Sequence, residues 1–144
     1  MDASRKPIRS YEDLEVYQRG RDLLRRVHKL VLSFPAYETY GLVDQMRRAT
    51  KSVPANIVEG YAKKRYPLVF KTHLVSAMGS ANEMVVHLQI ARDLEYISEA
   101  VCAELVAEFE VVGKQLNVLA SRWRDLGDKP LRPTSDLQRP KDQS

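Results

Sequence analysis

The sequence predicts an all-α protein, an antiparallel up-down-up-down four-helix bundle. Apolar residues recur three or four positions apart over four long segments, residues 11–34, 42–61, 68–94 and 98–123, which is the period of amphipathic helices. The connections between these segments are short, and short connections favour antiparallel neighbours. No segment shows the alternation of apolar and polar residues that is typical of strands.

The first two helices are bounded by residues that start or stop a helix. Ser10 is the expected N-cap of the first, with Asp13 three residues on, as in a capping box. Pro35 ends this helix because proline has no backbone N–H. The second helix follows Gly41 and contains Pro54. The predicted core faces are Val16, Gly20, Leu23, Val27, Leu30 and Phe34 in the first helix, and Leu42, Met46, Ala49, Val53, Ile57 and Gly60 in the second.

The last two helices follow a basic segment, residues 63–67, that ends in proline. Ser98 is the expected N-cap of the fourth helix. Their predicted core faces are Phe70, Leu74, Ala77, Met78, Ala81, Met84, Val85 and Leu88 in the third, and Val101, Leu105, Phe109, Val112, Leu116, Leu119 and Trp123 in the fourth. We expect residues 1–10 to be a disordered lead-in, residues 11–126 to form the bundle and residues 127–144, with three prolines, to be a disordered tail.

Length and composition are those of one soluble domain. The chain has 144 residues, of which 44% are hydrophobic and 29% charged, and this length fits a single domain. No apolar run approaches the roughly 20 residues that cross a bilayer, and the N-terminus lacks the apolar stretch of a secretion signal. The single cysteine, Cys102, cannot form an internal disulfide. We therefore expect a cytoplasmic protein with no membrane attachment.

Motifs of catalysis are missing from the sequence. It has no phosphate-binding glycine loop, no paired CxxC and no nucleophile elbow, and its three histidines lack the spacing of helical metal sites. Glu83 and His87 lie four residues apart and are expected to share a helix-surface hydrogen bond. Cys102 lies on the core side of its helix and is expected to be a buried, inert thiol. The sequence predicts no enzyme, no cofactor and no metal site.

Two helices carry more apolar surface than one core needs. The side of the third helix opposite its core face has a second apolar line, and the second helix has a shorter one after Pro54. A helix that is apolar on two sides is buried on two sides, although scattered apolar surface residues are also normal. We predict a homo-oligomer whose interface contains Ala55, Val58, Ala62, Leu68, Val75, Gly79, Val86 and Ile90.

Charge is unevenly distributed along the chain. Residues 1–75 carry a net charge of +7, residues 76–126 carry −4 and the last 18 residues carry +1. The basic half predicts either a surface for a polyanion or charge pairing between helices. Tyr61 and Tyr66 flank the basic loop and offer rings on which an unpaired base can stack. The candidate phosphate contacts are Arg47, Arg48, Lys51, Lys63, Lys64, Arg65, Lys71, Arg19 and Arg26. Part of the charge of Arg19 and Arg26 is already used, because Glu15 and Asp22 lie four residues before them.

One segment resembles a known family. Residues 45–61 read QMRRATKSVPANIVEGY, and their Arg-Arg, Ser-Val-Pro-Ala-Asn-Ile and Glu-Gly-Tyr elements resemble the signature of the bacterial four-helix-bundle family. That family includes proteins encoded within 23S ribosomal RNA intervening sequences. Residues 11–17, 78–83 and 88–92 agree with it as well, so the resemblance covers roughly residues 10–124. In place of a more aliphatic family stretch, this chain has His73-Leu74-Val75-Ser76-Ala77.

The resemblance implies a homopentameric ring of antiparallel four-helix bundles. It also implies kinship with the accessory variability determinant proteins of diversity-generating retroelements, which bind their reverse transcriptase and nucleic acid through a basic surface. In the Pro-Ala-Asn-Ile-x-Glu-Gly motif, we expect Pro54, Asn56, Glu59 and Gly60 to serve packing and helix contacts more than ligand contact.

Two functions remain open from the sequence. The first is a non-enzymatic, ring-forming protein that binds RNA or DNA, as the accessory subunit of a reverse transcriptase or as an RNA-binding protein encoded in a ribosomal RNA insertion. The second is an oligomeric scaffold whose basic patch binds an acidic protein partner.

Overall fold

The computed structural model describes residues 7–128. Four α-helices make up most of this range: α1 (Glu15–Leu30), α2 (Leu42–Ala62), α3 (Pro67–Asp93) and α4 (Glu99–Asp128). Three short 3₁₀ turns precede or follow α1: η1 (Tyr11–Asp13), η2 (Val31–Ser33) and η3 (Ala36–Glu38). The all-α class and the four helices are therefore confirmed.

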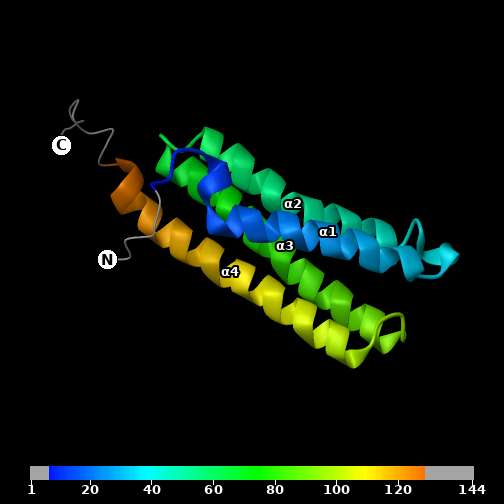
Figure 1. The fold of residues 1–144 in the computed structure, drawn as a ribbon. Coiled ribbons are helices and arrows are strands. Elements are labelled where there is room, and N and C mark those ends of the chain that lie inside the picture. Colours follow the sequence, from blue (N-terminus) through cyan, green and yellow to red (C-terminus); the bar gives the residue numbers. More distant parts are fainter. Residues whose placement is uncertain (1–6, 129–144) are drawn as a thin grey trace.

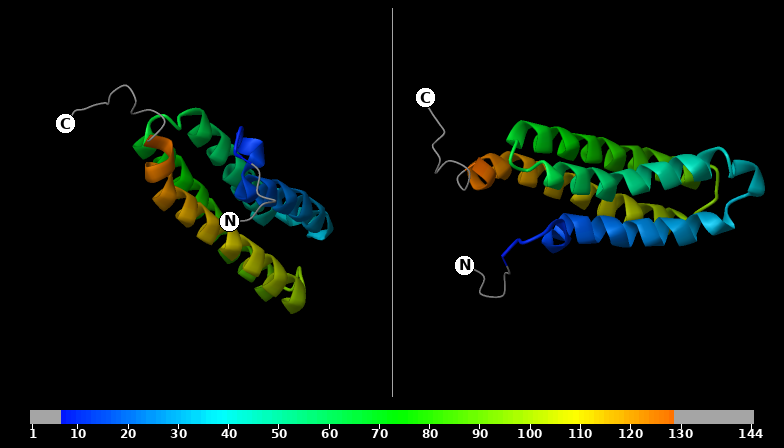
Figure 2. Two further views of the ribbon diagram at one scale, coloured as in Figure 1. Left: turned by 60° about the vertical axis from the view of Figure 1, so that its left-hand side comes forward. Right: turned by 90° about the horizontal axis from the view of Figure 1, so that it is seen from above.

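The helices run alternately up and down in one bundle (Figure 1). Within it, α3 packs along both α2 and α4, whereas α1 lies mainly against α2 and only lightly against α4. The α1–α2 and α3–α4 connections lie at one end of the bundle, and η1, the α2–α3 connection and the end of α4 lie at the other (Figures 1 and 2).

The core follows the predicted faces. Each helix contributes residues with almost no exposed surface, among them Leu23 in α1, Ile57 in α2, Leu74 in α3 and Phe109 in α4. At the end where α4 finishes, Phe70 lies between Tyr61 and Trp123, in edge-to-face contact with both rings. Such aromatic pairs add to the stabilisation that burial itself gives, so this end of the bundle is firmly packed.

Local signals set the helix ends. Ser10 and Asp13 form the predicted capping box, but it caps η1, because Leu14 is extended and separates η1 from α1. The Ser98 hydroxyl accepts a hydrogen bond from the backbone N–H of Val101 (3.1 Å), which confirms it as the N-cap of α4. At the end of α3, the N–H of Tyr96 donates to the carbonyl of Ala91 and the N–H of Glu95 to that of Arg92, the bonding of a Schellman motif.

Besides the later start of α1 at Glu15, the predicted boundaries differ clearly from the structure in two places. The α1 helix stops at Leu30, and the turn to Phe34 continues as 3₁₀ helix rather than as α-helix. The α4 helix extends to Asp128, five residues beyond the predicted end and two beyond the expected bundle limit. The expectations for residues 1–6 and 129–144 lie outside the described residues. Over the described range, every helix is too short or too polar to cross a lipid bilayer.

Candidate nucleic-acid interface

The first turns of α2 carry three of the predicted phosphate contacts. Arg47, Arg48 and Lys51 are all exposed. The Arg48 guanidinium lies 2.8 Å from the Asp44 carboxylate, one turn earlier on the same helix. The side chains of Arg47 and Lys51 have no ion pair or hydrogen bond among residues 7–123, the range in which side chains are described. We call Arg47, Arg48 and Lys51 the α2 basic cluster; two of its three charges are free to meet an anion.

A second group of cations lies at the other end of α2. Lys63, Lys64 and Arg65 are exposed in the α2–α3 connection, and Lys71 is half-buried one turn into α3. The Trp123 indole N–H donates to the Lys64 carbonyl (3.1 Å), and the Lys64 ammonium lies 4.4 Å from the centre of the Tyr61 ring. These contacts hold the backbone of the loop, so its charges are presented in a fixed place.

The two groups of cations do not form one continuous patch. From Lys51, the last residue of the α2 basic cluster, to Lys63 the chain advances 12 positions, about 18 Å at 1.5 Å per residue. Between them the outer face of α2 carries Ala55 and Ala62, which are exposed, and Val58, which is half-buried. Candidate interface residues and candidate phosphate contacts therefore share this face of α2, as their helical spacing in the sequence predicts.

The expectation that Tyr61 stacks on a base is wrong. Its side chain is only 7% exposed, and its ring packs against Tyr11, Phe70 and Trp123. Burial raises the pKa of its hydroxyl, with a smaller contribution from Asp13. Tyr66 is 60% exposed and remains available for stacking.

Arg19 and Arg26 are engaged within the bundle. Arg19 lies 2.9 Å from Glu108, and Arg26 lies 2.7 Å from Glu104, so both bridge α1 to α4; the expected partners Glu15 and Asp22 contact them too. Partial burial lowers the pKa of Arg19, but its hydrogen bonds to Glu108 and Glu15 outweigh that effect and raise it overall. Of the two interpretations of the charge asymmetry, pairing between helices therefore accounts for these arginines, which makes them weaker candidates for phosphate contacts.

The Pro-Ala-Asn-Ile-x-Glu-Gly motif faces α3. The Asn56 amide donates to Ser52, its carbonyl oxygen lies 3.3 Å from His73 Nδ1, and the Ser80 hydroxyl donates to Ser52 (2.8 Å). A Cβ atom on Gly60 would lie 2.7 Å from the Phe70 ring, so α2 and α3 approach closely only because this residue is glycine. These contacts agree with the expected packing role of the motif.

Uncovered apolar side chains form a line along α3. Leu68, Val75, Val86 and Ile90 are 78%, 52%, 51% and 39% exposed, and Gly79 lies between them with no atom within 4 Å of the place a Cβ would take. The line extends over 22 helical positions, about 33 Å. We call these five residues the α3 stripe. An apolar line of this length is typical of an interaction surface.

Two predicted side-chain environments, those of His87 and Cys102, agree with the structure. His87 Nε2 lies 2.9 Å from Glu83 Oε2, the expected hydrogen bond, and Cys102 is 2% exposed, with its thiol against the Leu88 carbonyl. Within the described range, no group of three or more His, Cys, Asp or Glu side chains is placed to hold a metal ion.

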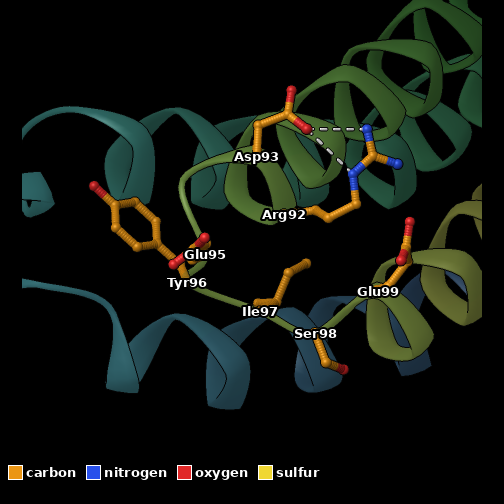
Figure 3. Close-up of a pocket in the computed structure, with 7 residues that line it drawn as sticks. All are labelled: Arg92, Asp93, Glu95, Tyr96, Ile97, Ser98 and Glu99. Carbon is orange, nitrogen blue, oxygen red and sulfur yellow. Dashed lines mark hydrogen bonds and ion pairs between the residues drawn. The ribbon is translucent and has the colours of Figure 1, made fainter.

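A hollow of about 520 Å³ lies at the α3–α4 connection. Figure 3 shows Arg92 paired with Asp93 on one side of it and Glu99 on the other. Glu95 also lines it. Three carboxylates against one paired arginine make this hollow unfavourable for a phosphate.

Sequence reasoning missed the corner where α1 turns into α2. Leu32, Tyr37 and Tyr40 are exposed there, and the Tyr96 hydroxyl from the α3–α4 connection donates to Glu38 (2.8 Å) and contacts Tyr37. The signal was present as aromatic residues on either side of Pro35, but apolar periodicity does not register residues outside the helices.

This fold and these surfaces define a class: an all-α four-helix bundle with unpaired cations and uncovered apolar side chains on its outer faces.

The chain belongs to the family of 23S rRNA-intervening sequence proteins, whose family model matches residues 12–118. Its fold is similar to the crystal structure, at 1.70 Å resolution, of a protein of unknown function from the S23 ribosomal protein family of Bacteroides thetaiotaomicron VPI-5482. The TM-score is 0.67 at 20% identity, and the alignment covers 74% of this chain and 95% of the other. No curated protein sequence matches the chain. The resemblance seen in residues 45–61 is thereby confirmed.

Proposed function

We propose that this protein is a non-enzymatic, oligomeric nucleic-acid-binding protein. The observation that carries the proposal is the set of exposed cations that have no acidic partner in the described part of the chain: Arg47 and Lys51 on α2, and Lys63 and Arg65 in the α2–α3 connection. When such lysine and arginine side chains neutralise phosphates, the nucleic acid releases its condensed counterions. That release drives sequence-independent binding.

The family's name refers to an intervening sequence of 23S ribosomal RNA, which is where such proteins are encoded, and it names no ligand. The role of accessory subunit beside a reverse transcriptase, which the resemblance implies, is the more specific form of the same proposal. Both roles use the same physical property, a positive surface that tracks a phosphate backbone.

Association of subunits is the second part of the proposal. The α3 stripe leaves four large apolar side chains in water, and covering them with a second copy removes that cost. A closed ring repeats the α2 basic cluster and so multiplies the phosphate contacts available to one strand. Five subunits is the number that the resemblance implies.

The test of binding is the salt dependence of affinity for a labelled RNA strand and a DNA strand. Replacing Arg47, Arg48 and Lys51 with alanine should reduce the slope of log K against log[salt] by about 2 to 3, since each phosphate contact contributes about 0.7–0.9. The control is Arg92→Gln, which removes a cation that is already paired with Asp93. An unchanged slope in the triple variant would place the site elsewhere.

Absence of salt-dependent binding to either strand would overturn the proposal. Capture of an acidic protein that survives nuclease treatment would then favour the protein-docking scaffold instead.

Association is tested separately by sedimentation or light scattering at micromolar concentration. The Val75→Glu, Val86→Glu double variant should be monomeric, because two buried carboxylates would oppose contact between copies. Leu32→Glu, at an exposed apolar residue off the stripe, is the control and should associate like the original chain. A monomeric original chain would refute this part of the proposal.

A further inference from the structure

A hollow of about 350 Å³ lies in the groove between the end of α1 and the start of α2. We call it the corner pocket. Its lining includes His28 and Leu32 from the α1 side, Pro35 from the turn, and Val43 and Arg47 from α2. Its volume is near the lower end of the roughly 300–1,000 Å³ of small-molecule sites, so it suits one compact group rather than an extended ligand.

The charge of the corner pocket is of one sign. The Arg47 side chain is exposed and unpaired within residues 7–123, His28 faces the pocket from the neighbouring helix, and no carboxylate belongs to the lining. This distinguishes it from the hollow in Figure 3, which three carboxylates line.

Positive charge continues along the groove away from the pocket. Arg25 lies three residues before His28, and Lys51 lies four residues after Arg47. Residues three or four positions apart share a helix face, and α1 and α2 are antiparallel neighbours. Arg25 and Lys51 therefore extend the same positively charged groove, and both are exposed.

Apart from Thr39, whose hydroxyl donates to the Ala36 carbonyl, the remaining lining is apolar. Leu32 is largely exposed, Val43 is half-buried against the core, and Pro35 presents a rigid ring. An apolar wall next to a guanidinium matches a ligand that joins a flat, weakly polar group to an anion. An unpaired nucleotide has this composition, because its base has an apolar face and its phosphate is charged.

We propose that the corner pocket holds one unpaired base of a single-stranded nucleic acid, with Arg47 and His28 at the adjoining phosphates and Arg25 and Lys51 at the next ones. The proposal rests on the proposed function and adds a requirement for single strands. A base in a duplex is stacked and paired, so it cannot enter the pocket without being extruded.

The experiment compares three labelled ligands of equal length by fluorescence anisotropy: a single strand, the same strand made abasic, and a duplex. The abasic strand keeps its phosphates and loses its bases. We expect it to bind about 10-fold more weakly than the intact strand, because only the intact strand buries the apolar face of a base against Leu32 and Pro35. The duplex should also bind more weakly than the intact strand.

The variant Ala36→Trp places a large ring at the exposed edge of the pocket and leaves every cation in place. It should reduce affinity for the intact strand about 10-fold and leave affinity for the abasic strand unchanged. The matched control is Ala103→Trp, at an exposed alanine on α4, which should change neither. Circular dichroism confirms that both variants fold.

Equal binding of intact and abasic strands, or an Ala36→Trp variant with full affinity, would overturn the corner-pocket proposal and leave the proposed function standing. Competition by adenosine monophosphate at the same concentration as the strand would also overturn it, since the ligand would then be a free nucleotide. Loss of salt-dependent binding to all three ligands would instead refute the proposed function itself.

Discussion

Replacing Gly60 with alanine tests the close approach of α2 and α3. A Cβ atom at this position would lie 2.7 Å from Phe70 Cδ1 and 2.8 Å from His73 Cβ. Both distances are well below the 3.5–4.0 Å at which carbon atoms attract one another. The ring of Phe70 is fully buried, and Tyr61 and Trp123 hold it from two sides. The ring therefore has no room to move away, and the two helices must separate.

The expected cost follows from two opposing contributions. Forcing an extra methyl group into a packed core costs about 1–3 kcal/mol, whereas exchanging glycine for alanine inside a helix gains about 1 kcal/mol. The net change for Gly60→Ala should be a destabilisation of about 0–2 kcal/mol, toward the upper part because two contacts are affected at once.

Gly113→Ala provides the matched control. Gly113 lies inside α4, and no atom lies within 4 Å of its Cβ position, so the variant should be more stable by about 1 kcal/mol. Urea unfolding followed by circular dichroism measures both, at one fixed protein concentration because association contributes to stability. Equal unfolding free energies for the two variants would show that the α2–α3 contact is looser than described and would refute the reasoning.

Three further outcomes follow from other parts of the structure. Glu95 has a φ of 65° at the end of α3, and Glu95→Gly should raise the unfolding free energy by about 1 kcal/mol in a thermal melt; Glu95→Ala, which keeps the Cβ, should not, and an equal gain would contradict the strain. The pKa of Glu38 is lowered by the Leu42 backbone N–H and then by the Tyr96 hydroxyl. A lowered carboxyl pKa stabilises the fold above the unfolded-state pKa, and this contribution is lost as pH falls through the folded-state pKa. Below about pH 5 the original chain should therefore lose stability more steeply than Glu38→Gln, and parallel pH profiles would refute this. Cys102 should react with a thiol reagent only after unfolding, because it is 2% exposed; rapid labelling of the native protein would contradict its burial.

The sequence predicted the helices and their buried faces because both depend on local order. A spacing of three to four residues places Leu23 and Val27 on the same side of α1, whatever the helix later contacts. Proline at position 35 and serine at position 98 act on backbone groups within one turn. Glu83 and His87 met as expected because their spacing on one helix fixes their distance.

Contacts between helices could not be read in the same way. Arg19 and Arg26 carry the same charge as Arg47, yet they pair with Glu108 and Glu104 because α4 lies beside α1 in a particular register. Nothing in the order of residues states that register, which only the packing of the whole bundle fixes.

The same reason applies to the remaining differences. The sequence by itself determined four amphipathic helices, the Ser98 cap of α4 and a basic first half, since each is a property of neighbouring residues. Only the tertiary structure decided that Tyr61 is buried, that Arg19 and Arg26 pair with α4, and that His28 and Arg47 line one pocket. These depend on which side chains from distant segments meet, and that is set by the sum of many long-range contacts rather than by any local pattern.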